Sequence, residues 1–165
     1  EATAYCNWLN KKNKLQKAYD EEKWEVIGDD KIPKIEGYRL ATAKEWEYAA
    51  RGGKNGKATK YAGSDDADEV AWHMYNDKEG INSNLFFGEG PHSVGEKKSN
   101  ELGIYDMSGN VCEWTNYTYE SGVAFFGGYF GDRIKDWALE VNAFDYLNPK
   151  GADYLRGFRV FKTKL

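Results

Sequence analysis

The stretch Leu102-Gly-Ile-Tyr-Asp-Met-Ser-Gly-Asn-Val-Cys-Glu-Trp-Thr115 places a turn between two apolar runs. The turn consists of Ser108, Gly109 and Asn110, which are residue types that favour tight turns. Apolar residues flank the turn on both sides, as they do where a chain reverses inside a packed domain. The stretch therefore predicts a turn that connects two apolar segments.

A second motif lies upstream, in Tyr38-Arg-Leu-Ala-Thr-Ala-Lys-Glu-Trp-Glu-Tyr-Ala-Ala-Arg-Gly-Gly53. Thr42 and Glu45 have the spacing of a capping box, in which each side chain binds the other residue's backbone N–H group. The pair Gly52-Gly53 is a typical helix end. The motif predicts a short helix that starts after Thr42. The stripe it buries consists of Trp46, Ala49 and Ala50.

The rest of the chain alternates short regular segments with long loops. Residues 1–19 suggest a helix, residues 23–27 a short strand, and residues 123–130 and 156–161 strands of a small antiparallel sheet. Residues 54–98 are irregular, and a loop of that length needs anchors to the core. The expected anchors are aromatic: Tyr61, Trp72, Tyr75, Phe86 and Phe87. This pattern predicts a loop-rich α+β protein.

Composition limits the classes of function. The 165 residues fit one domain, residues 1–165, and the net charge of -4 gives no basic surface for nucleic acid. No apolar run is long enough for a transmembrane segment. Aromatic residues make up 16% of the chain, a level typical of proteins that use rings for packing and contact. Cys6 and Cys112 could form a disulfide, but two free core thiols are the favoured interpretation. We expect a monomer.

Several segments, in this order, carry a family resemblance. Residues 38–53 and 102–115 resemble conserved motifs of the formylglycine-generating enzyme, or sulfatase-modifying factor, family. Gly127-Gly128, followed by Gly157-Phe-Arg-Val160, resembles the end of the family's domain, and Ala4-Tyr-Cys-Asn-Trp-Leu9 also fits. The resemblance spans nearly the whole chain. It implies a C-type-lectin-like fold of the formylglycine-generating-enzyme subtype, with short helices and a small antiparallel sheet.

The same resemblance argues against catalysis. Oxidising members of the family carry two copper-binding cysteines in an interval that corresponds to residues 127–158, and this chain has none there. Cys112 stands where the family usually has a tryptophan. Related iron-dependent enzymes use a histidine cluster, whereas this chain has only His73 and His92, which we interpret as surface residues. We expect no enzyme activity. An oxidase of the same family, or a pseudoenzyme domain with a fixed role, remains the alternative.

The C-terminal third, residues 123–160, keeps the family's frame but changes its contents. Such a pattern resembles the variable proteins of bacterial diversity-generating retroelements, and the treponemal variable protein in particular. The resemblance implies a non-catalytic, receptor-type protein that binds a protein or another exposed macromolecule. The expected contact residues are Tyr129, Phe130, Asp132, Arg133, Asp136, Trp137, Phe144, Asp145, Tyr146, Asp153, Tyr154 and Leu155.

Exposure separates contact residues from core residues in this region. Tyr129, Tyr146 and Tyr154 are flanked by polar residues, so we expect these rings at the surface. Tyrosine supplies a large contact area at a small entropy cost, as binding surfaces require. The residues expected in the core are Phe125, Phe158 and Val160, because they lie within strand patterns.

A structural calcium ion is a further expectation from the resemblance. Asp106 and Glu113 would bind it through their side chains, and Gly109 and Val111 through their carbonyl oxygens. In the alternative, Asp106 caps the turn at Ser108 and Glu113 pairs with a base. No other cofactor is required. Residues 1–10 look like the middle of a helix, so we expect a preceding N-terminal portion that carries any anchor. The expected location is the cell surface or the periplasm.

Overall fold

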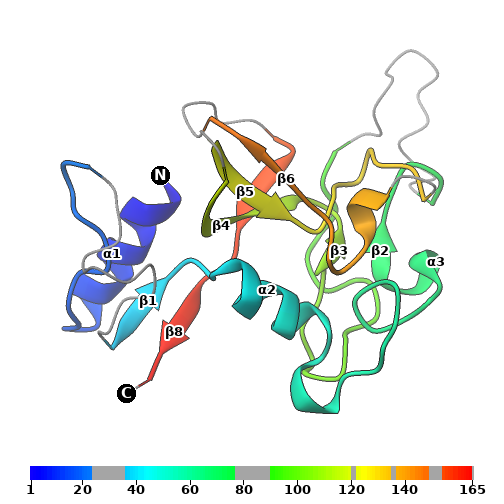
Figure 1. Cartoon of the computed structure of the whole chain (residues 1–165), viewed down its shortest axis with the longest axis horizontal. Helices are drawn as coiled ribbons and strands as arrows, with labels where there is room; N and C mark the ends of the chain where they lie inside the picture. Colours follow the sequence, from blue (N-terminus) through cyan, green and yellow to red (C-terminus); the bar gives the residue numbers. More distant parts are fainter. Residues whose placement is uncertain (24–35, 77–89, 120–121, 135–136, 149–153, 165) are drawn as a thin grey trace.

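The structure is a computed structural model that describes residues 1–23, 36–76, 90–119, 122–134, 137–148 and 154–164. It is a mixed α+β arrangement with few helices and a curled sheet (Figure 1). The helices are α1 (Ala2–Lys12), α2 (Ala43–Ala50) and α3 (Ala67–Val70), with the 3-10 turns η1 (Gly53–Asn55) and η2 (Trp137–Leu139). The strands are β1 (Gly37–Arg39), β2 (Ala71–Trp72), β3 (Ser108–Gly109), β4 (Cys112–Tyr119), β5 (Gly122–Phe126), β6 (Phe144–Leu147), β7 (Arg156–Phe158) and β8 (Phe161–Thr163).

The main sheet has four strands in the order β6-β5-β4-β7. β4 and β5 form an antiparallel hairpin, and β6 adds to the outer edge of β5, also antiparallel. β7 pairs with the other edge of β4 and runs parallel to it, so the predicted antiparallel arrangement holds for β4, β5 and β6 but is wrong for β7. Because β5 already occupies one edge of β4, the returning chain pairs with the opposite edge, and a crossover of this kind permits parallel pairing. β1 and β8 form a separate antiparallel pair.

The predicted helix at residues 43–50 is confirmed, including its capping box. The Thr42 hydroxyl accepts from the Glu45 N–H at 3.3 Å, and the Glu45 carboxylate accepts from the Thr42 N–H at 2.9 Å. Gly52 follows the helix with a φ of 78°, which suits glycine. The helix buries Trp46, whose ring stacks on Phe126 of β5 at 5.1 Å between centroids. α2 therefore closes one side of the main core against the sheet.

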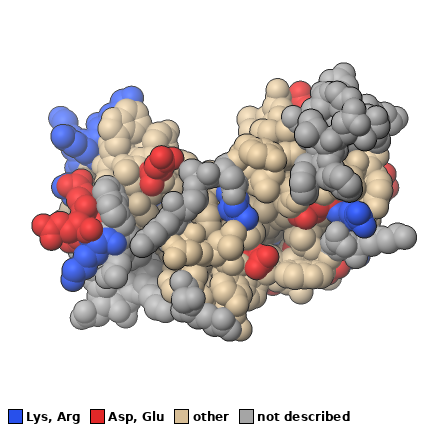
Figure 2. All heavy atoms as spheres, turned by 90° about the horizontal axis from the view of Figure 1, so that it is seen from above, with Lys and Arg blue, Asp and Glu red and all other residues tan. Residues whose placement is uncertain are grey.

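The first helix is shorter than the sequence suggests, because α1 ends at Lys12. Lys14 takes a φ of 59°, which breaks the helix. The buried amide of Asn7 then accepts from the backbone N–H groups of Ala18 and Tyr19 and fixes the chain in a non-helical path. The expected strand at residues 23–27 lies almost entirely outside the described residues. In Figure 2, charged side chains gather at the α1 end, and uncharged residues dominate the centre.

The long segment after α2 is largely irregular, as expected, and contains only η1, α3 and β2 in its described part. Tyr61 is buried and anchors it, and Trp72 is half-buried, whereas Tyr75 is 53% exposed and is no anchor. Phe86 and Phe87 lie outside the described residues. Within the described part of the chain, no helix is both long and apolar enough to cross a bilayer.

The pairing of Glu45 with buried Arg39 predicts acid sensitivity. Burial opposes ionisation of Glu45, but hydrogen bonds from Arg39 and Thr42 outweigh it and lower its pKa to about 2. The folded-state pKa lies below the ordinary value of 4.5, so the stabilisation is present above pH 4.5 and is lost as the pH falls towards 2. We expect the free energy of unfolding to fall less over this window in Glu45→Gln than in the wild type. Urea unfolding at pH 5, 4, 3 and 2 measures these free energies. The same decrease of the free energy of unfolding with pH in both proteins would contradict the prediction.

Candidate ligand-binding site

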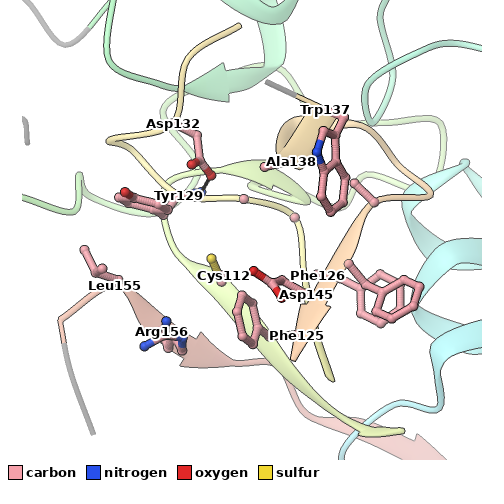
Figure 3. A pocket seen from close by; sticks show the side chains of 14 residues that line it. Cys112, Phe125, Phe126, Tyr129, Asp132, Trp137, Ala138, Asp145, Leu155 and Arg156 are labelled. Carbon is pink, nitrogen blue, oxygen red and sulfur yellow. Dashed lines mark hydrogen bonds between the residues drawn. The ribbon is translucent and has the colours of Figure 1, made fainter. Parts of the chain in front are cut away.

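An inner cavity of about 140 Å³ lies where the end of β5 meets η2, β6 and β7 (Figure 3). Its floor includes Cys112 of β4 and Phe125 of β5, and Arg156 of β7 lies beside them. In Figure 3 the Cys112 sulfur lies at the centre of the labelled side chains, with Tyr129 and Asp132 on one side. The cavity is bounded by both aromatic and charged side chains.

An outer groove of about 410 Å³ adjoins this cavity. It runs between β6 and η2, and Tyr119 at the end of β4 contributes to its lining. The two hollows share Trp137, Ala143, Phe144 and Asp145, so they form one continuous surface. The C-terminal third of the chain supplies nearly all of it.

Two glycines shape the entrance to the inner cavity. Gly127 and Gly128 have φ values of 94° and 66°, which other residues rarely adopt. A Cβ atom on Gly127 would lie 3.2 Å from the Trp46 ring, and one on Gly128 would lie 2.9 Å from the Ala138 carbonyl oxygen. Larger residues would therefore disturb both the core and η2. The glycine pair turns the chain out of β5 and into the loop that carries Tyr129.

Most of the predicted contact residues come together. Those that line the cavity or the groove are Tyr129, Asp132, Trp137, Phe144, Asp145, Tyr146 and Leu155. Arg133 and Tyr154 are exposed but line neither hollow. Asp136 and Asp153 lie outside the described residues. Seven of the twelve predicted contact residues thus lie at these two hollows, and ligand contact stays a prediction.

The prediction that Phe130 contacts a ligand is wrong, because this residue is completely buried. Its backbone N–H donates to the Asn110 carbonyl oxygen, and its ring packs against those of Tyr129 and Tyr154. A large apolar side chain gains more from burial than from contact with water. Phe130 therefore anchors the loop from below.

The other exposure predictions are mixed. Tyr154 is 63% exposed as expected, whereas Tyr129 and Tyr146 are only half-buried rather than fully exposed. Phe125 is in the core as expected. Phe158 is 38% exposed, and the prediction of a core position is wrong, because its ring packs edge-on against the exposed Tyr5 of α1. Val160 is half-buried.

Several lining residues are absent from the predicted contact set, among them Tyr119, Glu140 and Arg156. Tyr119 ends β4 and approaches the groove because its ring contacts Phe144 and Tyr146 of β6. Glu140 follows η2, and Arg156 precedes the Gly157 motif. Tyr119 lies directly before the predicted strand at residues 123–130, and this proximity was the one available signal. Glu140 gave no comparable signal.

The sequence as a whole matches one domain family. Residues 1–164 match the Sulfatase-modifying factor enzyme 1-like domain, which is the FGE-sulfatase family. The chain belongs to this family. The match confirms the resemblance that the motifs indicated.

Two relatives illustrate its range. The chain is 38% identical to Chaperone protein LppX of Paenibacillus barcinonensis over 136 residues, which are 69% of this chain and 48% of that protein. It is 35% identical to Inactive C-alpha-formylglycine-generating enzyme 2 of Mus musculus, over 51% of this chain and 27% of that protein. The chain therefore spans half or less of the length of these relatives. The family includes at least one member that is named inactive.

Two solved structures are similar to this chain. CarF aligns with a TM-score of 0.76 and 30% identity over 99% of this chain and 64% of that one. Treponema denticola variable protein 1 aligns with a TM-score of 0.72 and 25% identity, over 97% of this chain and 67% of that one. The expected likeness to a treponemal variable protein is confirmed.

The cysteine at the floor of the cavity has low reactivity. Cys6 and Cys112 are both free and buried, as the favoured interpretation predicted. Burial raises the pKa of Cys112 to about 12, and the nearby Asp132 carboxylate adds to the effect. Thiolate is the reactive form of cysteine, so Cys112 is a poor nucleophile near neutral pH. The guanidinium of Arg156 stands 4.7 Å from the Phe125 ring centroid and adds a positive charge to the cavity.

The histidines differ from expectation. His73 is completely buried rather than at the surface. Its Nδ1 accepts from the Tyr75 N–H at 3.2 Å, and its Nε2 lies 3.0 Å from an Asp68 carboxylate oxygen. Burial lowers the pKa of His73, so the ring is neutral at pH 7. His92 is half-buried and stacks on Trp72 at 3.7 Å. Both rings have structural neighbours, which explains their burial.

The expected calcium site fits the structure only in part. One carboxylate oxygen of Asp106 is buried and makes no hydrogen bond with the described residues, so it is available to a cation. The other accepts from the Gly95 N–H, so Asp106 does not act through the predicted turn cap.

Glu113 pairs with Arg159, as the alternative predicted, and accepts from it at 2.7–3.1 Å. That guanidinium already neutralises the carboxylate. Gly109 lies in β3 and Val111 just before β4, and calcium binding stays a prediction.

The Glu113–Arg159 pair predicts a large stability effect. Glu113→Gln leaves the guanidinium without its counter-charge in a largely buried place, where a lost partner costs about 3 kcal/mol or more. The matched control is Glu47→Gln, because Glu47 pairs with Arg51 at the exposed surface of α2. That change should cost no more than about 0.5 kcal/mol. Urea unfolding measures both, and equal losses would contradict the assignment.

Proposed function

We propose that this chain is a non-catalytic ligand-binding domain of C-type-lectin-like fold, with residues 1–165 as one domain. Its binding surface is the joined cavity and groove within residues 123–160. One observation carries the proposal: seven of the twelve residues expected to contact a ligand line these hollows. Aromatic rings interleaved with carboxylates are typical of contact surfaces.

Three further points support a binding role. The cavity holds a thiol whose pKa is raised to about 12, which suits packing better than redox chemistry. The sequence has no cysteine between residues 127 and 158, where the oxidising members carry theirs. One relative is named inactive, and a structural neighbour is named a variable protein. A pseudoenzyme role or an oxidase role is the competing proposal.

The ligand is a protein or another exposed macromolecule, encountered at the cell surface or in the periplasm. The outer groove is open and wide, and it presents Trp137 with 59% of its surface exposed. The name of one relative in sequence, Chaperone protein LppX, is consistent with a protein ligand. A macromolecule can cover the groove and the exposed Tyr154 together.

Truncation of the groove's tryptophan tests the binding surface. Protein ligands are first selected against the wild-type chain from a displayed peptide library, and their affinities are then measured by biolayer interferometry. Trp137→Ala should weaken binding by about tenfold or more, because exposed tryptophans at interfaces carry much of the binding energy. Trp8→Ala is the matched control, since Trp8 is 50% exposed on α1 and lines neither hollow. Equal effects of both changes would contradict the proposed surface.

The likeness to a variable protein extends the proposal to sequence variation. We expect the lining positions Tyr129, Asp132, Asp145 and Leu155 to differ among isolates, while Gly157, Phe158 and Arg159 stay fixed. Sequencing the 3′ end of the gene and its flanks in several isolates tests this. An invariant 3′ end without a template repeat would leave a binding domain of fixed specificity.

A further inference from the structure

The outer groove brings several aromatic rings to one place. Tyr119 contacts Phe144 and Tyr146, with centroids 5.6 and 5.0 Å apart, so the sheet presents a connected aromatic surface. Trp137 of η2 lines the same groove. Tyr119 and Trp137 are 38% and 59% exposed, so a ligand can reach their rings. The negative faces of such rings attract cations.

The charges of the groove also favour a cationic ligand. Its charged lining residues within the described part of the chain are Glu140 and Asp145, and that lining includes no Lys or Arg. Asp145 is exposed, and one of its oxygens accepts from the Tyr146 N–H at 2.7 Å, which fixes the carboxylate beside β6. Lys60 lies 3.4 Å from Glu140, but both side chains are partly exposed, and such pairs are weak. A ligand cation can therefore compete for Glu140.

We propose that the outer groove binds the ammonium group of a lysine side chain presented by a protein ligand. This inference rests on the proposed function and names the chemistry that the groove recognises. The rings pack against the methylene chain and attract the charge, and the carboxylates of Glu140 and Asp145 accept hydrogen bonds from the ammonium.

Other ligand classes match the groove less well. An anion would face two carboxylates of like charge. A neutral apolar ligand would cover both carboxylates without supplying a donor, which is costly. A quaternary ammonium would satisfy the rings but cannot donate hydrogen bonds to Glu140 or Asp145. A primary ammonium satisfies both the rings and the carboxylates.

The test uses short linear probes of similar size that differ in the charge of their end group. The whole chain, labelled with ¹⁵N, is titrated with n-butylammonium, butyrate and 1-pentanol. The signal is the indole N–H of Trp137, identified by its loss in Trp137→Phe. Butylammonium should shift this signal to saturation, while the other two probes shift it at least about fivefold less at equal concentration, because the charge complementarity supplies the selectivity.

Charge variants sharpen the result. Asp145→Asn and Glu140→Gln should each weaken butylammonium binding by about threefold or more, and raised salt should weaken it in the wild type. Glu96→Gln is the control, because Glu96 is exposed and does not line the groove. The affinity of this variant for butylammonium should match that of the wild type.

The outcomes separate this inference from the proposed function. Equal shifts from butyrate or pentanol, tighter binding of tetramethylammonium, or no shift at all would overturn the lysine assignment. If Trp137→Ala still weakens the selected protein ligands in any of these cases, the binding function stands and only the ligand chemistry is wrong. If Trp137→Ala has no effect on those ligands either, both proposals are wrong.

Discussion

The buried carboxylate of Glu113 connects the parts on which the rest of the structure depends. It accepts from the Trp46 indole of α2 at 2.7 Å and from the Arg159 guanidinium just after β7. A buried charge is tolerable only when its partners are in place, so helix, hairpin and returning strand must arrive together. Trp46 in turn lies against Gly127, where the chain leaves β5 for the cavity. The geometry of the proposed binding surface therefore depends on this carboxylate.

Local signals explain what the sequence revealed of the fold. The capping box of Thr42 and Glu45 needs residues only three apart, so α2 could be placed accurately. The end of α1 depends instead on long-range contacts, in which the amide of Asn10 binds the backbone of Tyr38. The parallel pairing of β7 with β4 is equally non-local, because it joins residues more than forty positions apart. No periodicity within one segment encodes such a partner.

The candidate site also combines features that local sequence signals reveal with features that depend on long-range contacts. Departures from the family's pattern identified residues such as Trp137 and Asp145, because replaced residues within a retained frame mark a surface under different demands. Burial was harder to infer: Phe130 follows a glycine pair and a tyrosine, and His73 lies in a largely irregular segment, yet tertiary packing encloses both. Tyr119 joins the groove only through the pairing of β4, β5 and β6, which places it beside β6. Its role follows from the sheet and not from its own sequence context.

The position of the groove has an evolutionary consequence. Its side chains come largely from the edge strand β6 and from η2, whereas the main core is built chiefly from α2, β5 and the segment before β4. Some lining residues, such as Asp145 and Trp137, therefore lie outside the main core, whereas Phe144 and Tyr146 line the groove and also pack against that core. If the proposed variation occurs, exchanges at the lining positions outside the core should cost little folding stability. The exception is Phe130, a fully buried residue inside the changing segment, where selection should retain a large apolar side chain.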